Sequence, residues 1–297
     1  MRPFAILEPL SVAEASSMLV EHGEAARLYA GGTELLLVMK EGLLHYDYLV
    51  NLKTVPGLDQ VRYDAATGQV HIGALVTHRT LERSPVIQQH LPVLAQAESQ
   101  VANVRVRNVG TIGGNLCFAE PHADPGPVLL LYGATVTLAS ATGQRELPLG
   151  QFFVDSFEVA LEPGEILTEI HVPVLPPRSA AAYLRFAFLE RPSVGVGVAL
   201  TLDGSGQGVV DARIAVGCVG PKPTRMEEAE ALLKGLSLEE ALARAEQAGE
   251  LAGRQSRAVS DLHGSAEYKE HLVKVLTRRA AWAAAAQLRP ELARQSA

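Results

Sequence analysis

Cysteine is scarce in this 297-residue sequence, which contains only Cys117 and Cys218. Two thiols cannot build a disulfide framework, a four-thiolate zinc site or an iron–sulfur cluster. Any iron–sulfur chemistry connected with this protein must therefore reside in another chain. We predict that both cysteines are small buried side chains without a redox role, because free thiols are often core residues.

An excess of positive charge is also missing. Lysine and arginine number 26 against 33 acidic residues, which gives a net charge of -7, and the basic residues are scattered along the chain. Such a chain has no basic stripe for phosphates, so nucleic-acid binding is not expected. No apolar run reaches the roughly 20 residues of a membrane span, and the N-terminus lacks a signal-peptide pattern. These features predict a soluble, cytoplasmic protein without a membrane span.

Known catalytic motifs are absent as well. The sequence contains no G-x-S-x-G, no H-E-x-x-H, no Walker A lysine and no reactive-looking cysteine beside a histidine. The G-x-G-x-x-G fingerprint with a following ribose-binding acid is missing too. We therefore predict no catalytic side chain, and any redox activity has to come from a bound cofactor.

Length and local pattern predict an α+β protein of three compact units, at residues 1–55, 56–175 and 176–297. The chain is 47% hydrophobic, which is enough to bury a core in each unit. The prolines within residues 173–177 predict a linker before the third unit, since paired prolines interrupt both helices and sheets.

Helix and strand signals occur in all three units. Capping boxes, each with a serine followed three residues later by a glutamate, are expected to open helices at Ser11 and Ser237. Further helices are expected over residues 86–100, 225–233, 238–251 and 266–288. Three strands are expected to form an antiparallel sheet in the third unit, over residues 183–188, 194–202 and 209–216.

Two glycine-rich stretches stand out, residues 30–35 (Ala-Gly-Gly-Thr-Glu-Leu) and residues 107–116 (Arg-Asn-Val-Gly-Thr-Ile-Gly-Gly-Asn-Leu). Each is expected to be a loop whose backbone N–H groups point to one concave spot, because consecutive glycines lack a Cβ. Thr33, Thr111 and Asn115 add side-chain donors. Neutral donors from two loops suit the diphosphate of a dinucleotide. The alternative is that the glycines only form tight turns where chains pass closely.

Asp124 follows the second stretch, and its carboxylate can accept hydrogen bonds from ribose hydroxyls, with helix capping as the alternative. His122 and Asp124 together offer too few ligands for a metal ion, so no metal site is predicted. His78 and His171 are expected to have structural roles.

At these stretches the sequence resembles the FAD-binding medium subunit of the molybdenum hydroxylases, the family of carbon monoxide dehydrogenase, xanthine dehydrogenase and 4-hydroxybenzoyl-CoA reductase. The resemblance covers nearly the whole chain. It is carried by residues 30–35, 72–78, 107–116 with Asp124, 165–167, 220–225 and 260–268.

The resemblance implies a two-subdomain FAD-binding fold of the vanillyl-alcohol-oxidase (PCMH) type, followed by a smaller C-terminal α+β domain, with the flavin between them. It implies that residues 31–34 and 111–115 hold the pyrophosphate, that Asp124 binds the ribose or adenine end, and that Leu167 and Arg185 approach the flavin ring. The full implied set is Ala30, Gly31, Gly32, Thr33, Glu34, Leu35, Thr111, Gly113, Gly114, Asn115, Asp124, Leu167 and Arg185.

Some positions depart from the family pattern. The family often has lysine where Arg185 stands, and a cation there would favour reduced, anionic flavin. Small residues are commoner at Glu120 and His122, which leaves the contacts of that segment open. The four extra cysteines of a 4-hydroxybenzoyl-CoA reductase flavin subunit are missing, so no additional cluster is expected.

The implied function is that of an electron relay. A molybdopterin large subunit would oxidise the substrate, an iron–sulfur small subunit would relay single electrons, and this chain's FAD would pass them to NAD or another acceptor. One alternative is a self-sufficient flavin-dependent oxidase or dehydrogenase, which needs a positioned base that the sequence does not suggest. Another is a non-catalytic interaction module.

Overall fold

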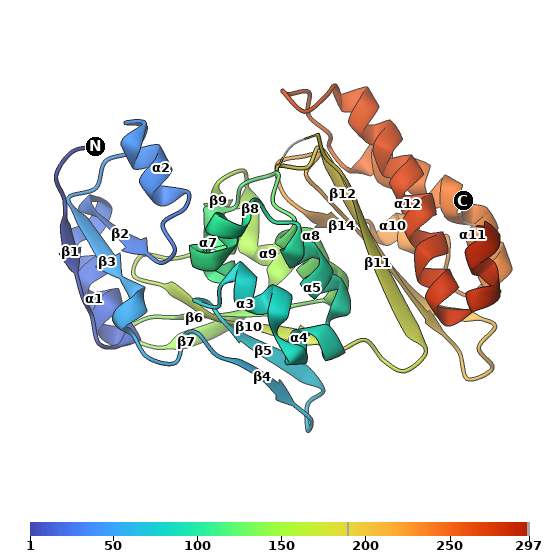
Figure 1. The fold of residues 1–297 in the computed structure, drawn as a ribbon, viewed down its shortest axis with the longest axis horizontal. Helices are drawn as coiled ribbons and strands as arrows, with labels where there is room; N and C mark the ends of the chain where they lie inside the picture. Colours follow the sequence, from blue (N-terminus) through green and yellow to red (C-terminus); the bar gives the residue numbers. More distant parts are fainter. Residues whose placement is uncertain (189, 296–297) are drawn as a thin grey trace. The chain divides into compact units, whose positions relative to one another are not determined.

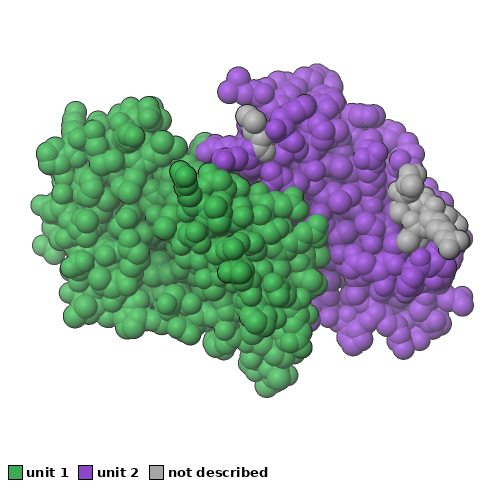
Figure 2. Space-filling view, viewed as in Figure 1, with its two compact units in different colours: residues 1–119, 134–173 green, residues 120–133, 174–297 purple. Residues whose placement is uncertain are grey.

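The computed structural model describes residues 1–188 and 190–295. Its internal contacts divide the chain into two compact units, coloured separately in Figure 2. Unit 1 comprises residues 1–119 and 134–173, and unit 2 comprises residues 120–133 and 174–297. The segment 120–133 therefore packs with the C-terminal part of the chain. The finer division into three parts remains a prediction.

Unit 1 begins with a small parallel sheet of three strands in the order β1-β3-β2. Its elements are β1 (Ala5–Leu7), α1 (Val12–His22), η1 (Gly23–Ala25), β2 (Ala26–Tyr29), α2 (Leu35–Lys40), β3 (Tyr48–Asn51) and η2 (Leu52–Thr54). Ser11 caps α1 as predicted, because its side chain accepts from the Glu14 N–H, but the capping box is incomplete, since the Glu14 carboxylate accepts from the Leu10 N–H instead of the Ser11 N–H. Buried Ala15, Val50 and other apolar residues form the core under this sheet.

The second sheet of unit 1 has five strands in the order β4-β5-β10-β6-β7, all antiparallel to their neighbours. The strands are β4 (Val61–Asp64), β5 (Gln69–Gly73), β6 (Thr135–Ala139), β7 (Gln144–Pro148) and β10 (Ile166–Pro173). Side chains alternate across the central strand β10: Ile170 and Val172 are fully buried, whereas Glu169 and His171 lie on the opposite face and are partly exposed. One face of this sheet is thus apolar and the other polar.

Short helices make up most of the rest of unit 1, and Figure 1 shows several of them in cyan and green beside the five-stranded sheet. They are α3 (His78–Arg83), α4 (Pro85–His90), α5 (Pro92–Ser99), α6 (Val104–Val109), α7 (Ile112–Phe118) and α9 (Leu149–Phe152), with the small pair β8 (Phe153–Asp155) and β9 (Glu158–Val159). The single helix expected over residues 86–100 is wrong. Pro92 has no N–H to donate, so the helix breaks at Leu91 into α4 and α5.

Unit 2 contains an antiparallel sheet in the order β11-β12-β13-β14, with helices packed on it. Its elements are α8 (Pro125–Tyr132), β11 (Ser179–Phe186), β12 (Val194–Leu202), β13 (Val209–Gly217), β14 (Thr224–Arg225), α10 (Glu227–Ala231), α11 (Leu238–Gln255), α12 (Ala266–Leu288) and η3 (Pro290–Gln295). The predicted three-stranded sheet has a fourth strand, because residues 224–225 pair with β13 instead of starting a helix. The capping box at Ser237 opens α11 as predicted.

The core of unit 2 lies between this sheet and the long helices α11 and α12. The contacting faces of these two helices consist largely of alanine and glycine, which allows their backbones to approach closely. Despite its 23 residues, α12 is not apolar enough for a bilayer, and no helix among residues 1–188 and 190–295 has the properties of a transmembrane span.

Candidate cofactor-binding site

The first glycine-rich stretch connects β2 to α2 in unit 1. Gly32 has a φ of +72°, in the left-handed region that side chains with a Cβ rarely adopt. Gly31 is required for a different reason, since a Cβ there would overlap the carbonyl oxygen of Val109 and crowd the backbone of Gly110. The two predicted glycine-rich stretches therefore lie against each other, backbone to backbone.

Several backbone N–H groups of the first stretch have no hydrogen-bond acceptor within the described protein. Among the described residues, the N–H groups of Gly32, Thr33 and Leu35 donate to no protein acceptor. These groups precede or begin α2, where a helix leaves its first N–H groups without internal partners. A cluster of open neutral donors is the kind of group that binds the oxygens of a diphosphate. The stretch has the open backbone donors that the sequence predicts, and diphosphate binding by it stays a prediction.

The second stretch is built differently and is not a loop. Residues 107–116 span the end of α6, a turn at Gly110 and the first turn of α7. The backbone N–H groups of residues 112–115 all donate within the protein, to Val76 O, Ala74 O, Thr111 Oγ1 and Thr111 O in that order. The prediction that backbone N–H groups are free to bind a ligand is therefore wrong for this stretch. What it offers to a ligand is the exposed backbone of Gly114 and the partly exposed Asn115 side chain.

Two glycines in this second stretch are explained by close packing. A Cβ at Gly113 would lie 2.6 Å from the carbonyl oxygen and from the Cβ of Ala74, and a Cβ at Gly110 would lie 3.1 Å from the His78 ring. The interpretation of double glycines as points of close approach thus applies to Gly31 and Gly113. It does not apply to Gly114, where the nearest atom is the side-chain oxygen of Thr111.

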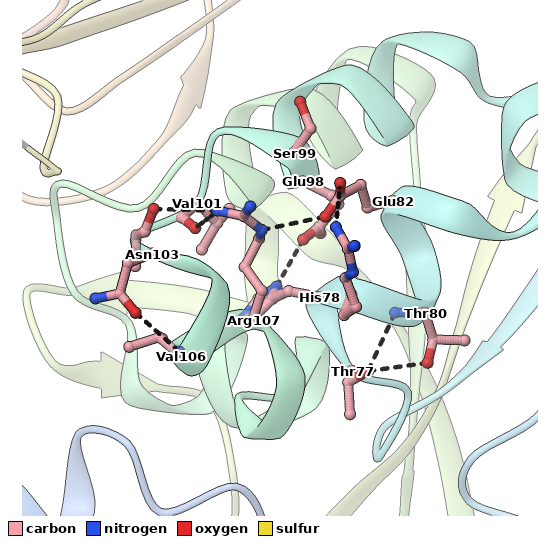
Figure 3. A network of polar contacts seen from close by, with 12 residues as sticks. Thr77, His78, Thr80, Glu82, Glu98, Ser99, Val101, Asn103, Val106 and Arg107 are labelled. Atoms are coloured by element: carbon pink, nitrogen blue, oxygen red, sulfur yellow. Dashed lines mark hydrogen bonds and ion pairs between the residues drawn. The ribbon is translucent and has the colours of Figure 1, made fainter.

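A buried pair, His78 and Glu98, contacts the second stretch, and both side chains are labelled in Figure 3. His78 Nδ1 lies 2.6 Å from Glu98 Oε2, and both residues are almost completely buried. The backbone N–H of His78 donates to the Gly110 carbonyl at 3.0 Å. This position agrees with the structural role predicted for His78, because it connects the turn at Gly110 to α5.

Arg107, at the start of the stretch, is held by several acceptors (Figure 3). Its Nε donates to Glu82 Oε2 at 3.1 Å, and its Nη1 donates to the carbonyl oxygens of Val101 and Ala102. Asn103 caps α6 by accepting from two backbone N–H groups. The Arg107 side chain therefore orders the segment before the second stretch.

Asp124 lies in unit 2 and is 3% exposed. Its Oδ1 accepts from the Tyr183 hydroxyl at 2.8 Å, and its Oδ2 accepts from Arg185 Nη1 at 2.7 Å. Arg185 also donates to the Glu190 carbonyl. Two residues that the sequence predicts for the same site are thus in direct contact. Helix capping is the wrong explanation of Asp124, because its side chain makes no capping hydrogen bond to α8.

Tyr183 was missed by the sequence analysis. Burial raises its pKa well above the ordinary value, and the nearby Asp124 carboxylate adds to the effect, so the hydroxyl stays protonated and donates. A signal was available, because Tyr183 and Arg185 are two residues apart on a strand and therefore face the same side.

Leu167 lies on β10 in unit 1 and is 2% exposed. It is opposite Leu138, next to an irregularity in the pairing of β10 with β6. Its proximity to a flavin ring stays a prediction. The neighbouring Glu165 has a structural partner, since it accepts two hydrogen bonds from Arg145, which lower its pKa.

The departures Glu120 and His122 belong to a polar network within unit 2. His122 lies 3.2 Å from Glu120 Oε1 through Nδ1 and 3.0 Å from Asp261 Oδ2 through Nε2. Asp261 in turn accepts from the fully buried Lys269 at 2.6 Å. These contacts connect the segment before α8 to the start of α12.

Neither cysteine is suited to redox chemistry. Burial raises the pKa of Cys117 to about 12 and raises that of Cys218 well above its ordinary value. A protonated thiol is neither a good nucleophile nor a good metal ligand. The protonation states agree with the structural role predicted for both residues.

Comparison with known proteins accounts for both parts of the chain. Residues 2–175 match the family described as the FAD binding domain in molybdopterin dehydrogenase, and residues 190–284 match the CO dehydrogenase flavoprotein C-terminal domain. The chain is 34% identical to the nicotine 6-hydroxylase medium subunit of Paenarthrobacter nicotinovorans, over 91% of this chain and 93% of that protein. It is 32% identical to the carbon monoxide dehydrogenase medium chain of Hydrogenophaga pseudoflava, over 93% and 96%.

Solved structures agree with these matches. A chain of carbon monoxide dehydrogenase from Hydrogenophaga pseudoflava superposes with a TM-score of 0.91 at 32% identity, covering 96% of this chain and 98% of the other. Quinoline 2-oxidoreductase from Pseudomonas putida 86 gives a TM-score of 0.87 at 29% identity, with coverage of 97% and 98%. The PCMH-type fold with its C-terminal domain is thereby confirmed. The chain belongs to the family of FAD-binding medium subunits of the molybdenum hydroxylases.

Proposed function

We propose that this chain collects electrons from an iron–sulfur small subunit and passes them to NAD or another acceptor, while a molybdopterin large subunit oxidises the substrate. The open donor cluster of the first glycine-rich stretch carries the proposal, since it fits the diphosphate of FAD. FAD, when bound, supplies the ability to accept electrons singly and release them in pairs. The chain itself contains only two cysteines, both buried or partly buried, which supports a separate carrier of the iron–sulfur clusters.

In unit 1 the protein contributes binding and orientation. The N–H groups of Gly32, Thr33 and Leu35 would hold the diphosphate from one side, with Ala30, Gly31 and Glu34 completing the turn. Thr111, Gly113, Gly114 and Asn115 form the other side, where the Asn115 amide donates and Thr111 stabilises the turn. We divide the roles in this way because the first stretch has backbone N–H groups without a protein acceptor, whereas the backbone N–H groups of residues 112–115 donate within the protein.

In unit 2 the contact between Asp124 and Arg185 has two consequences. Asp124 accepts from the Tyr183 hydroxyl and from Arg185, and these two contacts hold its carboxylate in the orientation in which it would accept from a ribose hydroxyl. Arg185 is fixed by Asp124 and the Glu190 carbonyl, so its charge is held in one place near the ring position that the family resemblance implies. Leu167 would present an apolar side chain to the ring.

The test is FAD binding by the full chain. Visible absorbance and melting temperature are measured with and without added FAD, on the wild type, on Gly32→Asp, on Asn115→Ala and on the control Gly143→Ala. A Cβ at Gly143 meets no atom within 4 Å, so this control should behave as the wild type. Bound flavin in the wild type and control, with loss in Gly32→Asp, is the expected result. A folded wild-type chain that ignores FAD, alone and in its co-purified complex, would overturn the assignment.

The electron acceptor has its own test. The FAD-loaded complex is reduced anaerobically and mixed with NAD, and reoxidation is followed by absorbance. Fast reoxidation supports NAD, whereas unchanged reduced flavin directs the search to another acceptor. The self-sufficient oxidase is not favoured, because the relatives are named as subunits or chains of complexes. Substrate-dependent flavin bleaching by the isolated chain would restore that alternative.

A further inference from the structure

Three potential metal ligands meet on the polar face of the five-stranded sheet in unit 1. His71 on β5 is directly opposite His171 on β10 in the antiparallel pairing. Glu169 precedes His171 by two residues and therefore faces the same side. All three ligand atoms lie within 4.8 Å of one another. His71 is 98 and 100 residues away from Glu169 and His171 in the sequence, and the pairing of β5 with β10 brings it to them.

The spacing of the ligand atoms allows one metal ion within bonding distance of all three, although the two histidine nitrogens are closer together than in a regular tetrahedral site. The two Nδ1 atoms of His71 and His171 are 2.8 Å apart, and Glu169 Oε2 lies 3.3 Å from the first and 3.5 Å from the second. Ligands about 2.0–2.1 Å from a tetrahedrally coordinated Zn²⁺ ion stand roughly 3.3 Å from each other. A point about 2 Å from all three atoms therefore exists, slightly to one side of the triangle that they form.

Neighbouring residues orient the ligands as outer contacts do in metal sites. His171 Nε2 lies 2.6 Å from Thr137 Oγ1, so it can donate there and leave Nδ1 with a free lone pair. Arg62 approaches Glu169 at 3.3 Å from the solvent side. The ring nitrogen Nε2 of His71 is buried and has no hydrogen-bond partner in the described structure, so its Nδ1 makes all the polar contacts of that ring.

A neutral imidazole has one N–H and one nitrogen with a lone pair, so the tautomer of each ring decides what the cluster can bind. When both rings carry their proton on Nε2, the two Nδ1 atoms and Glu169 Oε2 present three lone pairs to one point. A cation at that point would be bound by all three atoms.

We propose that His71, Glu169 and His171 bind one divalent transition-metal ion of the zinc type. Two histidines and one carboxylate are a common ligand set for Zn²⁺. The side chains of both histidines are about nine-tenths buried, whereas that of Glu169 is 30% exposed, so the ion can enter from the Glu169 side. It would clamp β5 to the central strand β10 and stabilise unit 1. This site is separate from the glycine-rich stretches, and it revises the purely structural role predicted for His171.

The proposal is tested with zinc alone on the full chain after removal of metals by a chelator. Zinc binding is measured by competition with a chromogenic chelator, and the melting temperature is recorded with and without zinc. We expect one strongly bound zinc per chain and a rise in melting temperature of about 5 °C at 100 times the dissociation constant. The FAD content of the sample does not enter this measurement.

Substitutions of the proposed ligands test where the zinc ion binds. Glu169→Gln and His171→Asn should each weaken zinc binding by about 100-fold and abolish the thermal shift. The control His45→Asn removes an exposed histidine from the same unit and should change neither. Glu169→Gln is partly exposed, so it keeps the test valid even if His171→Asn fails to fold. Zinc binding that is equal in the wild type and Glu169→Gln, or the absence of a one-to-one site in the wild type, overturns the proposal.

Discussion

The two glycine-rich stretches look alike in sequence, yet they contribute opposite features to the structure. In the first, the amides of Gly32 and Thr33 remain open, and the backbone rests on its neighbour. In the second, the amides of residues 112–115 are used to hold the turn in place, and His78 with Glu98 supports it from beneath. The first stretch thus leaves backbone donors open, whereas the second uses its donors to hold its own turn and supports the first. A glycine pair in a sequence does not distinguish these two cases.

Gly31→Ala should have the largest effect on the packing of the two glycine-rich stretches. The added methyl group would overlap the Val109 carbonyl, which belongs to backbone and cannot rotate away. We expect a loss of about 3 kcal/mol in the free energy of unfolding, together with loss of FAD binding, because the two stretches must separate. Urea unfolding and flavin absorbance measure the two effects. Gly143→Ala is the matched control, and equal stability of the two variants would contradict the packing of one stretch on the other.

Breaking the buried His78–Glu98 pair should have the second largest effect on stability. Glu98→Ala leaves His78 buried without its carboxylate partner, and we expect a destabilisation of about 2 kcal/mol. FAD affinity should fall as well, because the turn at Gly110 loses its support. The control is Glu250→Ala on the surface of α11, which should cost no more than about 0.5 kcal/mol by thermal unfolding. If FAD affinity stays unchanged in folded Glu98→Ala, the second stretch does not depend on this pair.

Asn115→Ala tests whether the second stretch contacts FAD directly, because it should weaken FAD binding without changing the stability of the fold. The Asn115 side chain is partly exposed and makes no hydrogen bond to another described residue. We expect FAD affinity to fall about tenfold, which corresponds to about 1.4 kcal/mol, while the melting temperature without FAD stays unchanged. Fluorescence titration with FAD measures the affinity. An unchanged affinity would leave the second stretch with no direct role in binding.

The smallest expected effect concerns Glu82, which binds Arg107 before the second stretch. Burial alone would raise the pKa of Glu82, but Arg79 and Arg107 more than offset this and hold it below its ordinary value of 4.5. The ionised carboxylate therefore stabilises the fold above about pH 4.5, and this contribution is lost as the pH falls through the lowered pKa. Glu82→Gln should cost about 1 kcal/mol at pH 7 and nothing at a pH where the wild-type carboxyl is protonated. Denaturant unfolding at both pH values checks this, and a constant difference would contradict it.

Local signals in the sequence were sufficient where a few adjacent residues decide the structure. Ser11 caps α1, the capping box at Ser237 opens α11, and the long α12 covers the predicted residues. The helix over residues 86–100 failed because Pro92 outweighed an otherwise continuous helical pattern. The fourth strand of the unit 2 sheet is only two residues long, and its pairing with β13 is a tertiary contact that no local pattern contains.

The sequence predicts which residues belong to the site, and this membership stays a prediction, but it does not predict their geometry. The sequence points to both glycine-rich stretches, Asp124 and Arg185 as parts of one site. It does not indicate that Asp124 is already bonded to Tyr183 and Arg185, since that contact depends on how α8 meets β11. It equally hides the cluster around His71 and His171, because strand register decides whether two distant histidines are opposite each other.

The backbone contact between Gly31 and Val109 also limits how this part of the chain can vary. Neither segment can gain or lose a residue without displacing the other, so insertions and deletions in related chains should occur in both segments together or in neither. For protein engineering, the two segments are one transferable unit: a graft that moves only the first would bring the open amides to a scaffold that lacks the surface on which they rest.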